Sequence, residues 1–258
     1  MNDGIIQVIK GLFKSDDESI DDDEMLKVRV SSEIRLDRSL GIYGVEDPAS
    51  VTKLTIVGMM TRHDFKYIRK KMSANLQELD ISGVTIDNNR IPNKAFDHCS
   101  NLKSIAIPNT ILEIRKKTFS FCNSLTSISI PSSVLKIEEL AFYRCTSLTS
   151  ITIPESVNEI KFRAFSDCTA LTSITIPNSV INIGSAAFGN CTNLTSVTLP
   201  DSEIEIGNFA FYNCTSLTSI YIPKNVILIG EGVFENCPAY ITVDPENPYY
   251  SSECGKLI

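Results

Sequence analysis

Histidine is scarce in this sequence, with only His63 and His98 among 258 residues. His98 precedes Cys99, but neighbouring residues of an extended chain point to opposite sides, so these two side chains should not form a nucleophile–base pair. The sequence also lacks a glycine-rich phosphate loop, a G-x-S-x-G motif and an H-E-x-x-H motif. We therefore expect no catalytic residues, and we expect that the protein is not an enzyme.

Closely spaced cysteine pairs, which are typical of structural zinc sites, are also absent. Seven of the eight cysteines recur every 23 residues, from Cys99 to Cys237. Stacked coils would bring their Cα atoms to about 5 Å, but with parallel Cβ vectors that do not suit a disulfide. We predict a row of reduced, buried cysteines, no metal site and no cofactor. Cys254 stands outside this row, either as a free thiol or as a partner for another chain.

Long apolar runs and concentrated positive charge are missing as well. No window approaches the roughly 18 apolar residues of a membrane-spanning helix. Residues 1–24 hold eight acidic and two basic side chains, so they supply most of the net charge of −7. The rest of the chain is nearly neutral and has no basic stripe for a phosphate backbone, so nucleic acid is not an expected partner.

The first 24 residues are predicted to be an acidic, partly disordered segment. The spacing of Ile5, Ile9 and Leu12 fits one face of a short packing helix or of a membrane-surface anchor. Asp3 stands where a signal peptide carries positive charge, and no cleavage site follows, so no signal peptide is predicted. The acidic run over 16–24 lacks the loop glycine and the spaced ligands of an EF-hand, and it is interpreted as a solvated linker.

A period of 23 residues dominates the rest of the chain. Phenylalanines keep this step from Phe96 to Phe234, cysteines follow three residues after each of them, and prolines keep the step from Pro108 to Pro223. A fixed period of this length indicates a repeat architecture. Each repeat is one unit that cannot bury its apolar face alone, so it stacks on its neighbours.

One repeat, residues 145–168, shows the elements of a coil. Ile151 and Ile153 alternate with a threonine, which is the period of a β-strand, and Pro154 ends that strand because proline cannot donate to a sheet. A second short extended run follows over 157–160, and a tight or 3₁₀ turn returns the chain to the next cysteine. Strands that recur once per coil lie parallel, about 4.8 Å apart. Nine such rungs are predicted between residues 54–56 and 241–243.

The repeat pattern C-x2-L-x2-I-x-I-P-x2-[SV]-V-x2-I-x4-F-x2-C resembles the BspA-like leucine-rich repeat over roughly residues 51–258. The resemblance implies a repeat solenoid of the leucine-rich-repeat type, a helix-poor α/β fold. Its parallel β-sheet would lie on the concave face, with short strands and 3₁₀ turns on the convex side. It also implies binding or adhesion at a microbial cell surface, hence a cell-surface or secreted protein. The periodicity itself supports only the solenoid.

We expect three parts in the chain. Residues 1–24 form the acidic segment, and residues 25–50 form a capping hairpin that covers the first coil. The solenoid occupies residues 51–258, with regular repeats over 96–237 and a C-terminal cap or link over 238–258.

Two patterns near the N-terminus predict a strand and a helix. Leu26, Val28 and Val30 alternate, which suggests the first strand of the hairpin. Phe65, Ile68 and a methionine four residues later mark one face of an α-helix over 64–72, with Thr61 or Asp64 as its cap.

The outward positions of the predicted concave sheet form a regular lattice of hydroxyl groups. Since inward positions are fixed by the core, only these positions can vary to make a site. The predicted partner-binding residues are Glu78, Asp80, Ser127, Ser129, Ser150, Thr152, Ser173, Thr175, Ser196, Thr198, Ser219 and Tyr221. We expect a protein or glycan ligand here, with Tyr221 as its aromatic anchor. The alternatives are a neutral surface chosen for β-propensity and an array that binds ice or another crystal.

A second predicted surface is apolar. The position after the valine of the repeat is occupied by Leu112, Leu135, Ile181, Ile204 and Ile227, which would form an exposed stripe suited to weak self-association. From both surfaces together we predict a non-catalytic binding protein that makes protein–protein contacts or adheres to a host or cell surface. The alternative is a structural spacer or self-assembling repeat domain without a specific ligand.

Overall fold

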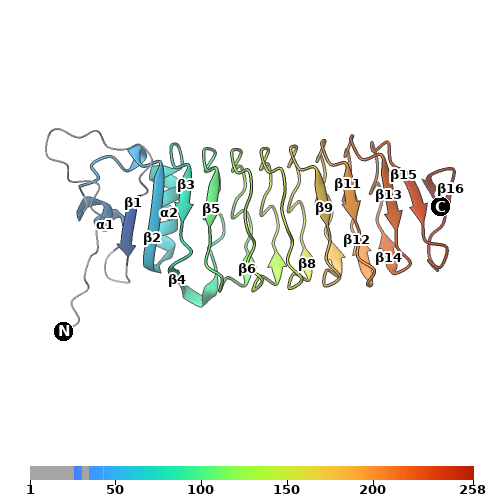
Figure 1. The fold of residues 1–258 in the computed structure, drawn as a ribbon, viewed down its shortest axis with the longest axis horizontal. Coiled ribbons are helices and arrows are strands. Elements are labelled where there is room, and N and C mark those ends of the chain that lie inside the picture. Colours follow the sequence, from blue (N-terminus) through green and yellow to red (C-terminus); the bar gives the residue numbers. More distant parts are fainter. Residues whose placement is uncertain (1–25, 31–34, 43) are drawn as a thin grey trace.

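The computed structural model describes residues 26–30, 35–42 and 44–258. Figure 1 shows their coils following one another along an almost straight axis from the N-terminal to the C-terminal end. Each coil passes over three sides of the array, which we call the lattice face, the second face and the turn face. The expectations for residues 1–24 lie outside the described residues.

The lattice face carries a short strand in most coils, and all of its pairings are parallel. In chain order these strands are β1 (Leu26–Val30), β2 (Lys53–Met60), β3 (Glu78–Asp80), β5 (Ser104–Ala106), β9 (Ser173–Thr175), β11 (Ser196–Thr198), β13 (Ser219–Ile222) and β15 (Tyr240–Val243). The two coils between β5 and β9 have no such strand, and they are joined on this face by a parallel bridge between Ser129 and Thr152. The predicted parallel rungs are therefore confirmed.

The second face is a six-stranded parallel sheet, in the order β14-β12-β10-β8-β7-β6. Its strands are β6 (Glu113–Ile114), β7 (Lys136–Ile137), β8 (Glu159–Ile160), β10 (Asn182–Ile183), β12 (Ile204–Ile206) and β14 (Val226–Ile229). Ion pairs join neighbouring coils across it, such as Lys136 Nζ to Glu159 Oε1 at 2.8 Å. The hydrogen bond from Lys136 lowers the pKa of the Glu159 carboxyl.

The turn face is built from successive tight turns, yet it has a backbone ladder of its own. In the coil around Phe165, the N–H groups of Arg163, Phe165 and Asp167 donate to carbonyls 22 residues later, at 2.8–3.0 Å. Two residues in each turn have positive φ, for example Arg163 (51°) and Asp167 (62°). Left-handed backbone is uncommon for such residues, and the inter-coil hydrogen bonds offset its cost.

Between the three faces lies one continuous apolar core. In the coil of Phe165 the inward residues are buried leucine, isoleucine and valine side chains together with Phe165 and Cys168. The Phe165 ring stacks between those of Phe142 and Phe188, with centroids 5.1 and 5.2 Å apart and planes within 5°. The phenylalanines that recur from Phe96 to Phe234 thus form one stack of rings through the core, which we call the phenylalanine spine.

The cysteine row is reduced, and it has a structural role. Six of its members are buried, Cys237 is half-buried and Cys254 is exposed. Each thiol from Cys122 to Cys237 donates to the carbonyl of the phenylalanine 26 residues earlier, as Cys145 Sγ does to Phe119 O at 3.1 Å. Cysteine therefore fits this position because it is small and apolar, yet still supplies a donor to a buried carbonyl.

The N-terminal cap differs from the predicted hairpin. β1 is parallel to β2, with Leu26 opposite Leu54, so it extends the lattice-face sheet by a further rung. Residues Leu36–Ile42 form helix α1 rather than a returning strand. The hairpin prediction for 25–50 was wrong because strand alternation shows which face of a strand is buried, and not which strand it pairs with.

The predicted helix near residue 64 is confirmed with shifted bounds. It comprises α2 (Arg62–Tyr67) followed by a π-helical turn, η2 (Ile68–Met72). Thr61 is its N-cap, and the buried Asp64 carboxylate accepts hydrogen bonds from the backbone N–H groups of Thr61 and Leu36. The same carboxylate thus joins α2 to α1.

The remaining elements are short. They are η1 (Pro48–Ser50), β4 (Val84–Ile86), η3 (Asp87–Asn89), β16 (Ser252–Glu253) and β17 (Lys256–Leu257). β16 and β17 form an antiparallel hairpin at the C-terminal end, where the Tyr250 hydroxyl accepts a hydrogen bond from Ile229 N at 2.8 Å. No helix among the described residues is long and apolar enough to cross a membrane.

Candidate binding surface

The lattice face presents rows of hydroxyl groups at the spacing of the strands. One row of threonines is engaged internally, since Thr149 Oγ1 donates to Thr126 O and Thr195 Oγ1 to Thr172 O, at 3.3 and 3.0 Å. Two further rows are exposed, and their side chains form no hydrogen bond with any described residue. They are Ser127, Ser150, Ser173, Ser196 and Ser219, and Ser129, Thr152, Thr175 and Thr198. The predicted lattice residues therefore lie together on one face with free donors and acceptors.

Tyr221 continues the second of these rows with an aromatic ring. Its side chain is 49% exposed, and its hydroxyl donates to Asp244 Oδ2 at 2.5 Å. This hydrogen bond raises the pKa of Tyr221 and lowers the pKa of Asp244. The carboxylate one coil later therefore holds the exposed ring in one orientation. Tyr240, which is 60% exposed, is a second aromatic residue on the same side that the prediction omitted.

The two acidic side chains at the N-terminal end of the lattice already have contacts within the chain. Glu78 lies 3.5 Å from the Lys53 ammonium group. The Asp80 carboxylate accepts hydrogen bonds from the backbone and the hydroxyl of Ser82, at 2.8 and 2.6 Å. Both acids are half-buried, so they shape the edge of the lattice and present only part of their charge to solvent.

The predicted apolar stripe is interrupted. Leu135 and Ile181 are 45% and 57% exposed, whereas Ile204 is fully buried. A register shift follows Ile204, which pairs with Val226, and the exposed Glu203 takes the preceding position. The core needs one β-branched residue at this point of the coil, and since Glu203 replaces the valine of the repeat, Ile204 turns inward. Including Ile204 in an exposed stripe was therefore wrong.

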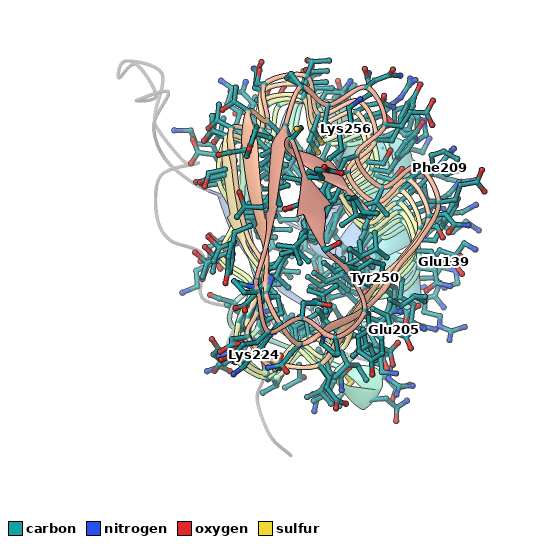
Figure 2. The ribbon with its side chains drawn as sticks, turned by 90° about the vertical axis from the view of Figure 1, so that its right-hand side faces the viewer. Glu139, Glu205, Phe209, Lys224, Tyr250 and Lys256 are labelled. Atoms are coloured by element: carbon teal, nitrogen blue, oxygen red, sulfur yellow. The ribbon has the colours of Figure 1, made fainter. Side chains whose placement is uncertain are left out.

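The turn face exposes aromatic and charged side chains, whereas the lattice face exposes mainly hydroxyl groups. In Figure 2, which views the array end-on, Glu139 and Phe209 project from this face. Phe162 and Phe209 are 43% and 38% exposed and flank a hollow of about 520 Å³, whose wall includes Ala186 and Gly189. The Arg163 guanidinium lies 5.2 Å from the Phe162 ring centroid. Sequence reasoning did not single out these residues, although their positions beside the recurring phenylalanine change from repeat to repeat.

Histidine and cysteine side chains are the remaining candidates for metal binding or nucleophilic chemistry within the described part of the chain. No cluster of three or more histidine, cysteine or acidic side chains there is arranged to hold a metal ion. His98 stacks on Phe121 with ring centroids 4.4 Å apart, and its side chain is exposed, whereas Cys99 is buried. Burial raises the pKa of Cys99 to about 12, so this thiol is not a nucleophile at neutral pH.

Solved structures with similar folds include two bacterial leucine-rich repeat proteins. One is a leucine-rich cell surface protein from Faecalibacterium prausnitzii, with 35% identity over 65% of this chain and 45% of that chain, at a TM-score of 0.59. The other is the T. pallidum leucine-rich repeat protein, with 28% identity over 76% of this chain and 73% of that chain, at a TM-score of 0.51.

The pneumococcal vaccine antigen PcpA is also similar, with 28% identity over 57% of this chain and 39% of that chain, at a TM-score of 0.52. The chain thus spans less than half the length of the F. prausnitzii protein that it matches. None of the curated proteins matches it significantly. The sequence model of the BspA-type leucine-rich repeat region matches residues 66–178 and 158–250, in six copies, and this chain therefore belongs to the BspA-type leucine-rich repeat family.

Proposed function

We propose that this chain is a non-catalytic binding module that attaches to a protein at a cell surface through its lattice face. The observation that carries the proposal is the pair of exposed hydroxyl rows without hydrogen-bond partners among the described residues. The similar F. prausnitzii protein is described as a cell surface protein, which supports a surface role for the fold.

The geometry suits a large partner better than a small ligand. The hydroxyl groups are spaced by one rung, about 4.8 Å, so they offer many similar, weak polar contacts over an extended area. Weak contacts need an anchor, and tyrosine is enriched among the residues that dominate binding energy at interfaces. Tyr221 is held by Asp244 in its exposed orientation, so little conformational entropy is lost when it docks.

The test begins with a panel of purified secreted and cell-surface proteins, immobilised and probed with the whole chain. For each protein that binds, we compare Thr175→Arg and Tyr221→Ala with the wild type. Both variants should weaken binding at least tenfold without changing the unfolding transition. Ser132→Arg adds the same charge at an exposed site outside the lattice, and it should bind as the wild type does.

The main alternative is that the partner protein binds to the exposed apolar side chains of the second face, Leu135 and Ile181. Normal binding by both lattice variants, together with loss of binding on Leu135→Asp or Ile181→Asp, would assign the interface to that face instead. A spacer without a specific ligand predicts no saturable binding to any protein of the panel.

A further inference from the structure

A concentration of positive charge lies where helix α2 meets the first regular coil. Two adjoining hollows of about 310 and 210 Å³ share Arg62, Pro92 and Arg115 in their walls. Lys66 and Arg69 complete the wall of the first, and Arg90 that of the second. The hollows thus form one groove, which we call the basic groove, with five cationic side chains drawn from three separate stretches of the chain.

Few carboxylates balance these cations. Arg90 Nη2 and Arg115 Nε lie 3.3 and 4.0 Å from the same carboxylate, that of Glu113. The exposed Asp87 lines the second hollow. Five cations against two acids leave a formal excess of three positive charges in the groove. The nearby Asp64 carboxylate is buried and occupied by backbone N–H groups of Thr61 and Leu36.

Two of the cations are free to bind a ligand. Arg62 and Lys66 are exposed, and neither forms an ion pair or a hydrogen bond through its side chain with any residue that the structure describes. Arg69 is fixed instead, because its Nη1 donates to the Lys94 carbonyl at 2.6 Å. The groove therefore contains cationic side chains without a partner among the described residues as well as one that is already fixed. Most of its cations are guanidinium groups, which can donate two parallel hydrogen bonds to a carboxylate or a sulfate group.

We propose that the basic groove binds an acidic glycan. Sulfate or carboxylate groups would pair with Arg62, Lys66 and Arg115, while the C–H faces of the sugar rings would lie on Pro92 and on the aliphatic stems of the arginines. The combined volume is that of a pocket for a drug-sized ligand, which corresponds to one or two sugar units.

Two other polyanions fit less well. A long nucleic acid would run along an array whose residues 121–258 hold thirteen acidic and only six basic side chains, so most of its length would be repelled. An acidic peptide can bind by adding a strand to an open sheet edge or by pairing its carboxylates with an arginine cluster. Strand addition is blocked at the neighbouring strand β2, because β1 pairs with one side of it and β3 and β4 with the other. This leaves a peptide only the contacts with the arginines, which the oligoglutamate probe tests.

The experiment measures binding of two labelled tetrasaccharides to the whole chain at fixed salt, one sulfated (heparin-derived) and one with carboxylates only (hyaluronan-derived). Binding of either supports the proposal, and the tighter one identifies the anion. Arg62→Ser with Lys66→Ser should weaken that binding at least tenfold. Lys103→Ser with Lys256→Ser removes the same charge outside the groove, and it should cost less than twofold.

Three results would overturn the proposal. They are no binding of either tetrasaccharide, equal losses in the two double variants, and binding of oligoglutamate or a single-stranded oligonucleotide of equal charge that is as tight as that of the glycan. Because the Arg62 and Lys66 side chains have no partner among the described residues, the groove variant should keep the unfolding transition of the wild type. The lattice-face test uses different residues and different probes, so either proposal can fail without the other.

Discussion

Removal of one ring from the phenylalanine spine should show how far the coils depend on one another. Phe165 is fully buried and stacks on a ring at each side, whereas Phe234 is half-buried and stacks only on Phe211, at 5.9 Å, among the described residues. Phe165→Ala should cost roughly 3–5 kcal/mol, as large-to-small changes at buried aromatics do. Phe234→Ala should cost about half as much, since less apolar area and one aromatic contact are lost.

The damage from Phe165→Ala should remain local at first. Repeat coils are coupled mainly to their neighbours, so the loss of stability should be greatest in the coils that contact Phe165. We would therefore follow amide hydrogen exchange coil by coil. Amides in the turn-face ladder next to Phe165, including those of Phe142 and Phe165 themselves, should exchange roughly 100- to 4000-fold faster, because every 1.4 kcal/mol is a factor of ten.

The N-terminal coils provide the internal control for this measurement. Amides of β2 and β3 lie several coils away and should keep the wild-type rates in the Phe165→Ala protein. Equal acceleration in every coil would refute the nearest-neighbour reasoning and show that the array unfolds as one unit. A cost for Phe234→Ala as large as that for Phe165→Ala would refute the assignment of the energy to two-sided stacking.

Three further predictions concern register and thiols. Ile204→Ala should lower the free energy of unfolding by about 2–4 kcal/mol and Ile181→Ala by less than about 0.5 kcal/mol, because of the two side chains only that of Ile204 is buried. Urea titration measures both values, and equal losses would contradict the register shift. Thiol labelling of the native protein should modify exposed Cys254 first and half-buried Cys237 next, while the six buried thiols react only after unfolding; early labelling of Cys145 would disprove the closed core. The pKa of each of those six thiols is raised, by burial in five of them (to about 12 for Cys99 and Cys191) and in Cys214 by the hydrogen bond with Cys237 together with burial. The unfolded chain therefore loses these protons first as the pH rises, and stability that is complete below about pH 8 should fall by about 1.4 kcal/mol per pH unit for each thiol. Cys145→Ala should make the urea midpoint less sensitive to pH between about pH 8 and 10, and a pH-independent midpoint in the wild type would refute this.

The regular part of the fold followed from sequence because one period fixes both the stacking and the inward residues. Phe165 and Cys168 could be placed in the core from their recurrence alone, and the structure buries both. The lattice hydroxyls could be placed on one outer face for the same reason, since strand positions alternate. Whether a hydroxyl is free or bonded to the neighbouring coil, as Thr149 is, depends on side-chain rotamers that periodicity does not determine.

What the sequence did not predict depends on contacts between distant segments. β1 could be recognised as a strand, but its parallel partner β2 begins 27 residues later and leaves no local signal. The basic groove joins Arg62, Arg90 and Arg115, which belong to three different turns of the array, so no single stretch of sequence shows how their charges gather. Left-handed backbone at residues such as Arg163 runs against single-residue preference, and it is imposed by the hydrogen bonds between coils.

The turn-face ladder has a direction. Its N–H groups, such as those of Arg163, Phe165 and Asp167, point toward the C-terminal end, and the carbonyls that accept from them point toward the N-terminal end. Many hydrogen bonds on the other faces run the opposite way, such as those from Lys161 N to Ile137 O and from Thr149 N to Thr126 O, so the peptide dipoles of the array largely offset one another. The direction therefore acts locally and not as a charge at each end. A further coil could continue all of these ladders only in the head-to-tail sense, because two arrays joined head to head would set carbonyl against carbonyl and N–H against N–H.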